Sequence, residues 1–259
     1  MTTPPLIGRT EAAVSSLEEA ISLIDPRLRE PIALPSNRPE TAAACIALLG
    51  EILFDAKAVA YLGRVGLAEA AEPIVRGMIE AYFNLLYLRH GDTTDDPALN
   101  FRAFALLEFE TFVKTSKGVH PDDATSLGRQ MQQMQSDHPQ AIQRMQQQRS
   151  QRGPGGLYWA SLNPNALIDR VSALIGADSI PLRELYKKAS WDTHQILAPI
   201  IHLERGTLDG RPAVKATDRT PPDEAAETQC NRAAVILRGV ASEIDDEWPG
   251  LFPGLVRRP

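Results

Sequence analysis

The sequence predicts an all-α protein built as a single helical bundle of about seven to nine helices. Alanine, leucine, glutamate, glutamine and arginine are abundant, and these residues lose little conformational freedom in a helix. Apolar side chains recur every three to four residues over long stretches, whereas the alternation typical of strands is scarce. Prolines and glycines separate these stretches, as is usual for helix starts and ends.

The N-terminal part is expected to form a helix over residues 10–24, followed by a proline-rich connector. The apolar residues of this helix follow a 3.6-residue rhythm. Four prolines come next, and they predict an extended chain because proline disfavours helix. These prolines are Pro26, Pro31, Pro35 and Pro39. We therefore divide the chain into an N-terminal helix with its connector, residues 1–36, and a bundle domain, residues 37–259.

The bundle domain is expected to begin with two long apolar helices. The first starts near Pro39, which suits a first helical turn, and ends at Gly63 and Gly66. The second runs over about residues 68–90 and is apolar on nearly every side, which is typical of a central helix. A further helix is expected over residues 98–117.

Residues 122–152 differ from the rest because they are rich in glutamine and poor in large aliphatic side chains. Pro139 interrupts them, so we expect two helical pieces. We interpret this segment as a polar helical insertion that projects from the bundle. The alternative is an arm that binds a partner.

Three helices are expected in the C-terminal part of the chain. They span residues 166–175, about 182–202 and 223–248. Asn163 or Asn165 is expected to cap the first of these helices, and Pro199 to kink the second. The stretch between the last two helices, residues 203–222, is rich in Gly, Pro, Asp and Thr and predicts a loop.

Composition narrows the environment and the partners. The formal net charge of −6 offers no broad basic surface, which disfavours nucleic acid as a partner but leaves room for a small basic groove. No run of about 18 apolar residues occurs, so we expect no membrane span. The first nine residues lack the pattern of a signal peptide, and the two cysteines lie in apolar runs. A cytoplasmic protein with two buried, free thiols is the expectation that follows.

Local signatures of common enzymes are missing from the sequence. It contains no GxxxxGK[ST] loop, no GxSxG elbow, no HExxH helix and no CxxC pair. The five histidines do not form a ligand spacing, so we predict neither a metal site nor a cofactor. The lack of local signatures does not exclude a functional site assembled from residues on distant helices.

A polar stripe crosses the apolar helix expected over residues 68–90. It consists of Arg76, Glu80, Asn84 and Tyr87. Offsets of 4, 8 and 11 residues place these side chains within about 80° of one another around the helix axis. Polar groups inside an apolar helix need partners. The stripe is therefore either a structural network braced by an Arg76–Glu80 ion pair or the wall of a ligand site.

A second polar segment contains Tyr186, Ser190 and His194, each four residues after the previous one. A serine next to a histidine is part of the logic of an activated nucleophile. Side chains at this spacing on one helix diverge, however, and no oxyanion hole is indicated. His194 could be a hydrogen-bonded core histidine, or it could share a pocket with Arg76 and Glu80.

These two segments resemble DUF5677, a family of uncharacterised bacterial and archaeal proteins. The stretch IVRGMIEAYFNLLYL, residues 74–88, is similar to an Arg-x3-Glu helix of that family, and LYKKASWDTH, residues 185–194, to its Tyr-x3-Ser-x3-His segment. Trp159 lies where the family often has a tryptophan. The resemblance covers roughly residues 68–202, and the chain departs from the family pattern at residues 191–193.

By matched position, the resemblance implies a set of candidate site residues. They are Arg76, Glu80, Tyr186, Ser190 and His194. The family brings no settled activity with it.

Three hypotheses of function follow. The first is a binding or interaction protein, linked to stress or phage defence, whose polar core holds a small anionic ligand at Arg76, with His194 as a titratable donor. The second is a metal-independent, nuclease-like hydrolase in which His194 transfers a proton and Arg76 stabilises charge. The third is a structural homo-oligomer assembled through the glutamine-rich segment. Asn84, Tyr87 and Tyr186 are expected to contact a ligand, and Glu80 and Ser190 to take part in any chemistry.

Overall fold

The computed structural model describes the backbone of most of the chain. The described residues are 6–115, 121–151, 160, 162–178, 183–184, 186, 203–208, 211–216 and 222–249. Eight α-helices, one short 3-10 helix and one two-stranded hairpin occur within them. The predicted all-α class and helical bundle are confirmed.

The chain groups into two compact units. Unit 1 contains residues 1–33, 47–82 and 180–259, and unit 2 contains residues 34–46 and 83–179. Two long helices, α2 (Pro39–Arg64) and α3 (Glu72–His90), contribute residues to both units. The division of the chain at residue 36 stays a prediction.

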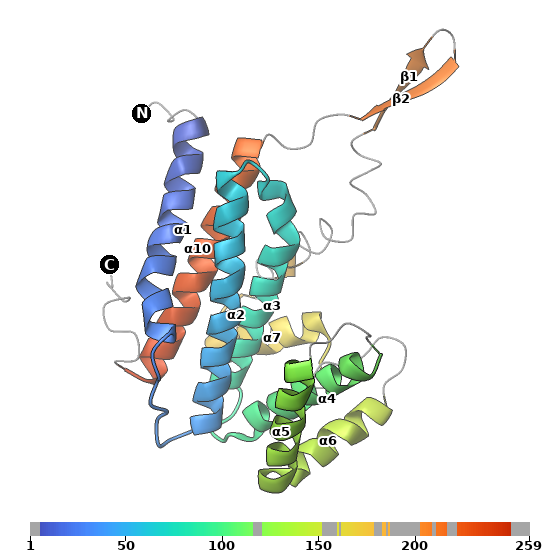
Figure 1. The fold of residues 1–259 in the computed structure, drawn as a ribbon. Coiled ribbons are helices and arrows are strands. Elements are labelled where there is room, and N and C mark those ends of the chain that lie inside the picture. The colour runs from blue at the N-terminus through green and yellow to red at the C-terminus, as the bar shows by residue number, and fades with distance from the viewer. Residues whose placement is uncertain are drawn as a thin grey trace. The chain divides into compact units, whose positions relative to one another are not determined.

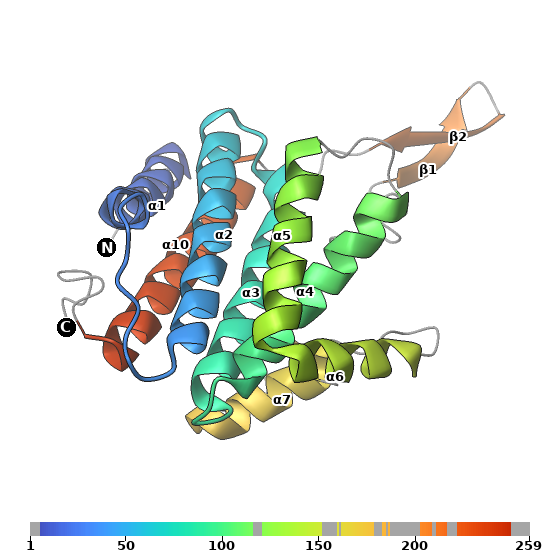
Figure 2. The same ribbon diagram turned by 60° about the horizontal axis from the view of Figure 1, so that its bottom comes forward.

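Unit 1 is built on helices from both ends of the chain. Helix α1 (Leu6–Leu28) and helix α10 (Pro222–Glu247) lie side by side in both ribbon views (Figures 1 and 2). The 3-10 helix η1 (Ala68–Ala71) also packs on α10. The largest fully buried side chains of this unit come from α1, α2, α3 and α10: Leu17, Ile24, Leu49, Ile52, Met78, Ile79 and Leu237.

Helix α1 is longer than the sequence predicts. It extends past residue 24 to Leu28 and contains Pro26, which the sequence analysis assigns to the connector. Pro26 removes the backbone donor that would bond the carbonyl of Ser22, so α1 lacks one hydrogen bond there. The helix continues for only two residues beyond this proline.

Gly63 does not end helix α2 but lies inside it, which corrects the prediction. A Cβ atom at Gly63 would lie 2.8 Å from Sγ of Cys230 and 3.1 Å from Cγ2 of Val14. The missing side chain thus lets α2 approach both α1 and α10. Gly66, at φ +73°, lies just beyond the helix end, where a left-handed residue commonly occurs. Cys230 and, in unit 2, Cys45 are buried and not disulfide-bonded, as predicted.

A β-hairpin occupies part of the stretch predicted to be a loop. Strand β1 (Leu203–Leu208) pairs antiparallel with β2 (Arg211–Ala216), with Leu208 opposite Arg211. The sequence carries a signal for this: Asp-Gly at 209–210 is a favoured dipeptide for two-residue hairpin turns. Apolar and polar residues alternate only weakly on either side of this dipeptide, so the sequence pattern does not indicate the two strands.

Unit 2 contains the glutamine-rich segment, folded as two helices around Pro139 as predicted. Helices α5 (Pro121–Asp137) and α6 (Pro139–Ser150) pack on α4 (Asp96–Thr115) and on each other. Five of their apolar side chains are buried: Leu127, Met134, Ala141, Ile142 and Met145. Arg149 donates hydrogen bonds to the carbonyl of Leu107 and the hydroxyl of Thr111, at 3.0 and 2.7 Å. These two helices are thus packed against α4, and Figure 2 shows them next to it.

Charged side chains hold helix ends in unit 2. Oδ1 of Asp95 accepts hydrogen bonds from the backbone N–H and the hydroxyl of Thr41, at 2.9 and 2.8 Å, in the first turn of α2. Arg38 donates to the carbonyls of Leu88 and Arg89 at the end of α3. Both contacts satisfy backbone groups that have no partner within their own helix.

Helix α7 (Pro164–Ile175) confirms one predicted cap. The Asn163 side chain accepts a hydrogen bond from the backbone N–H of Ala166 at 2.9 Å, and Gly176 ends the helix in the left-handed conformation. The helix predicted over about residues 182–202 falls almost entirely outside the described residues. Within the described part of the chain, none of the helices is both long enough and apolar enough to cross a membrane.

Two glycines of α2 make a matched test of the packing around Gly63. We expect Gly63→Ala to lower the free energy of unfolding by about 1–2 kcal/mol, because overpacking outweighs the gain in helix propensity. A Cβ atom at Gly50 would meet no other atom within 4 Å, so Gly50→Ala is expected to raise it by about 0.5–1 kcal/mol. Urea unfolding curves measure both. A gain of stability in both variants would contradict the packing argument.

Candidate functional site

Arg76, Glu80 and Tyr186 come together in unit 1. Nε of Arg76 donates to Oε1 of Glu80 at 3.1 Å, and the Tyr186 hydroxyl donates to the same oxygen at 3.1 Å. Nη2 of Arg76 lies 3.4 Å from the Tyr186 hydroxyl, and the guanidinium carbon lies 5.6 Å from the centre of the Tyr186 ring. The i,i+4 spacing on α3 produces the first contact, and a residue 106 positions along the chain from Glu80 completes the group.

Burial and charge fix the protonation of this group. Burial and the negative charge of Glu80 raise the pKa of Tyr186, so its hydroxyl stays protonated and can donate. Burial lowers the pKa of Arg76, but Tyr186 and Glu80 more than compensate, and the net shift is upward. Arg76 is therefore a permanent cation, and its side chain is 19% exposed.

Within the described part of the chain, both charged side chains have atoms that form no hydrogen bond. Among the described residues, the hydrogen bonds of Arg76 involve Nε and Nη2, and those of Glu80 involve Oε1. Nη1 of Arg76 and Oε2 of Glu80 make none there. With the Glu80 side chain 30% exposed, the pair offers a cationic donor next to an anionic acceptor, in an orientation fixed by Tyr186.

Asp55 is a candidate that the sequence analysis missed. It lies on α2, and a Cβ atom at Gly77 of α3 would lie 3.6 Å from its Oδ2. Burial, and then the nearby charge of Glu51, raise the pKa of Asp55 from 3.8 to about 6. Within the described residues its carboxylate has no hydrogen bond. The available signals were an acidic pair at i,i+4, Glu51 and Asp55, and a glycine inside an apolar helix.

Two other predicted site residues lie in the other unit. Asn84 and Tyr87 belong to unit 2, where Asn84 is half-buried and Tyr87 lines a cavity. Ser190 and His194 lie outside the described residues. Their roles, and the catalytic or binding roles of Arg76, Glu80 and Tyr186, stay predictions.

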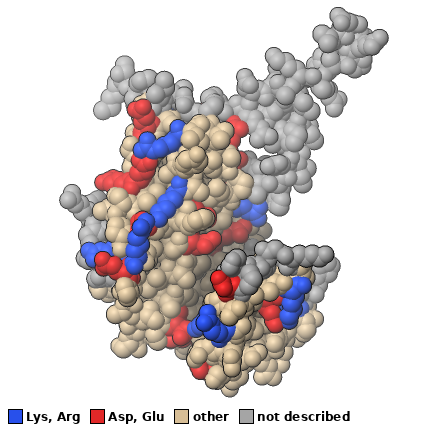
Figure 3. All heavy atoms as spheres, in the orientation of Figure 1, with Lys and Arg blue, Asp and Glu red and all other residues tan. Residues whose placement is uncertain are grey.

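Charges of both signs are mixed on the described part of one face. In Figure 3, Lys and Arg side chains lie beside Asp and Glu side chains there. Ion pairs occur among the described residues, such as Lys57 with Asp25 at 2.6 Å. No cluster of three or more His, Cys, Asp or Glu side chains suited to a metal ion occurs in the residues the structure describes.

Two aspartates of unit 1 are expected to affect stability with opposite sign. Because the pKa of Asp55 is about 6 in the folded chain and near 3.8 otherwise, its ionisation opposes folding as the pH rises from 4 to 6. Asp55→Asn should therefore raise the free energy of unfolding at pH 7 by about 1–2 kcal/mol, with no gain near pH 4.

Asp25 is the control for this prediction. Hydrogen bonds from Arg29 and Lys57 lower its pKa, so it stabilises the fold when ionised, and Asp25→Asn should lower stability at pH 7. Chemical unfolding at both pH values measures these effects. Equal losses of stability in the two variants would show that burial does not penalise the Asp55 carboxylate.

Comparison with known proteins gives one match. A family model described as a family of unknown function, DUF5677, matches residues 42–205. No curated protein and no solved structure matches the chain. The matched region contains Arg76, Glu80 and Tyr186 and spans more than half of the chain. This protein therefore belongs to the DUF5677 family of proteins of unknown function.

Proposed function

We propose that this chain is a ligand-binding protein that holds a small anion at Arg76 in unit 1. The observation that carries the proposal is the arrangement of Arg76, Glu80 and Tyr186. A half-buried guanidinium is fixed in place by two partners and still has Nη1 without a hydrogen bond among the described residues. A preorganised, partly desolvated cation binds an anion more strongly than a mobile surface cation does.

The neighbouring acid defines which anion fits. Glu80, paired with Arg76, has a second carboxylate oxygen, Oε2, which would repel an anion that has acceptor oxygens only. An anion that also carries a hydroxyl donor can bind Arg76 and donate to Glu80 at the same time. Singly protonated phosphate groups have both features, so phosphate and phosphate monoesters are the ligand class that we propose.

The hydrolase hypothesis has less support. It depends on His194 as the residue that transfers a proton, and His194 lies outside the described residues. The contacts of Arg76 and Glu80 hold fixed charges in place, which suits recognition of a ligand. The predicted link to stress or phage defence also stays a prediction.

Removal of the Arg76 charge tests the proposal. We expect Arg76→Gln to weaken the binding of inorganic phosphate at least tenfold, because a charge-assisted hydrogen bond is lost. Isothermal titration calorimetry on the full chain at pH 6.5 measures this affinity. Sulfate, which lacks a hydroxyl at this pH, is expected to bind more weakly than phosphate.

Arg29 provides a matched control. It also forms an i,i+4 ion pair with an acid, Asp25, but its side chain is 72% exposed. Arg29→Gln should leave phosphate affinity unchanged. Absence of saturable phosphate binding, or equal losses in the two variants, would refute the proposed anion site.

Self-association is a second candidate function, favoured by an exposed apolar stripe on α2. Phe54, Ala58 and Tyr61 follow one another at intervals of four and three residues and so share one helix face, and Val65 follows directly after the end of α2. The side chains of Phe54 and Tyr61 are 70% and 67% exposed, respectively. Large apolar side chains grouped on a surface commonly form interfaces.

The stripe predicts a concentration-dependent assembly of this chain. The double variant Phe54→Glu/Tyr61→Glu should sediment as a monomer at concentrations where the wild type associates, because charges would be buried in the interface. Val235→Glu is the control, since Val235 is 70% exposed but lies on α10. A wild-type monomer at every concentration in analytical ultracentrifugation would exclude this candidate.

A further inference from the structure

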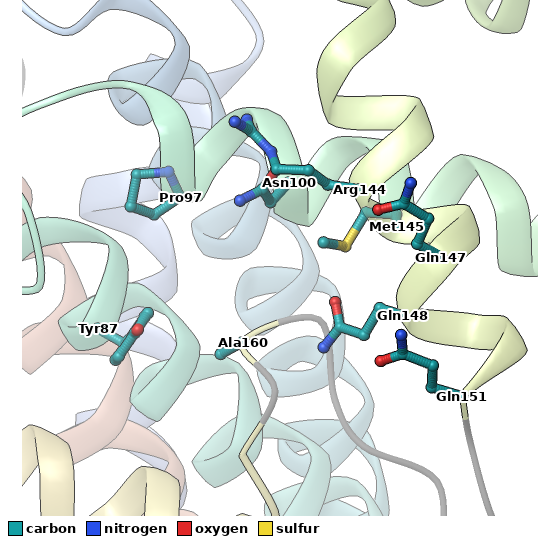
Figure 4. Close-up of a pocket in the computed structure, with 9 residues that line it drawn as sticks. All are labelled: Tyr87, Pro97, Asn100, Arg144, Met145, Gln147, Gln148, Gln151 and Ala160. Carbon is teal, nitrogen blue, oxygen red and sulfur yellow. The ribbon is translucent and has the colours of Figure 1, made fainter.

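Unit 2 contains a cavity that has no part in the proposed function, and of the predicted site residues Tyr87 lines it. Its volume is about 380 Å³, which falls in the range of small-molecule sites. The described lining residues come from α3, α4 and α6, together with Gln151 and Ala160 (Figure 4). They are Tyr87, Pro97, Asn100, Arg144, Met145, Gln147, Gln148, Gln151 and Ala160.

Among the described residues of this lining, the one charged side chain, Arg144, forms an ion pair. Nε of Arg144 donates to Oδ1 of Asn100 at 3.1 Å, and Nη2 donates to Oδ1 of Asp96 at 3.2 Å. The ion pair with Asp96 compensates the charge of Arg144. The cavity therefore differs from the site at Arg76, because it does not select for an anion.

Side-chain amides provide most of the polar groups of the cavity. In Figure 4, Gln148 and Gln151 extend from α6 toward Ala160, and Tyr87 and Pro97 stand on the other side of the hollow. Oδ1 of Asn100 accepts the hydrogen bond from Arg144, and the amide nitrogen of Asn100 takes no part in this contact. Each amide presents a donor and an acceptor in one plane.

The paired donors and acceptors of these amides match the hydrogen-bonding groups along the edge of a heterocyclic base. A purine presents acceptors and, in adenine, an amino donor along one planar edge, and a glutamine or asparagine amide pairs with the N6 and N7 positions of adenine. The ring of Tyr87 and the thioether of Met145 add apolar surface for the face of such a ring. The cavity is neutral overall, as is the base.

We propose that the cavity of unit 2 binds the adenine base of a nucleoside or nucleotide, with glutamine amides of α6 reading the base edge. The proposal also gives a role to part of the glutamine-rich segment. Gln147, Gln148 and Gln151 line the cavity, whereas Gln143 and Gln146 of the same helix do not. It does not depend on phosphate binding at Arg76.

Two double variants of α6 test the proposal with the same substitution. We expect Gln147→Leu/Gln151→Leu to weaken adenosine binding about tenfold or more, which corresponds to about 1.4 kcal/mol. Gln143→Leu/Gln146→Leu should leave the affinity unchanged. All four glutamines are exposed, so neither variant is expected to disturb folding, and circular dichroism checks this. Titration calorimetry with adenosine on the full chain measures the affinities.

A second ligand, cytidine, and one further variant, Arg76→Gln, test whether the binding is specific to adenine and to this cavity. Cytidine should bind at least tenfold more weakly than adenosine, because it lacks the N6 and N7 edge. Arg76→Gln should not change adenosine affinity, since Arg76 belongs to unit 1. The proposal is overturned if adenosine does not bind saturably at millimolar concentration, if cytidine binds equally well, or if the two double variants lose affinity equally.

Discussion

The need to pair polar side chains on an apolar helix governs the arrangement of the candidate site. Helix α3 buries apolar residues such as Met78 and Ile79 on its packed faces, so a charged residue within this run cannot be left without a partner. An unpaired buried charge would cost several kcal/mol. Arg76 and Glu80 satisfy each other, and Tyr186 joins them through the same carboxylate oxygen. Tyr186 is thereby connected to α3 by a polar contact.

Helix periodicity and capping chemistry made most of the helices predictable. The start of α2 at Pro39, the break at Pro139 and the Asn163 cap follow from local rules that act within one turn of the chain. The errors occurred where tertiary packing decides. Gly63 reads as a helix end by its local sequence, but its position beside Cys230 gives it a packing role instead. The hairpin at 203–216 depends on pairing between strands, which helix periodicity does not report.

The candidate site was predictable to the extent that it follows from spacing along one helix. The four-residue offset between Arg76 and Glu80 indicated their ion pair, whereas the contact with Tyr186 needed both polar segments to be considered together. Asp55 was not predictable, because its raised pKa comes from burial against another helix rather than from its sequence neighbours alone. The cavity of unit 2 likewise draws on residues from four parts of the chain.

The thiol that lies next to Gly63, that of Cys230, is buried and thereby shielded from thiol reagents. Burial, followed by the charge of Glu18, raises the pKa of Cys230 to about 11, so its sulfur is a neutral, enclosed thiol in unit 1. Cys45 is equally enclosed but belongs to unit 2. Alkylation requires an accessible thiolate. Each unit thus contains one buried cysteine, whose alkylation requires that unit to open. The rates at which the two sulfurs are alkylated would tell whether the two units unfold together or one after the other.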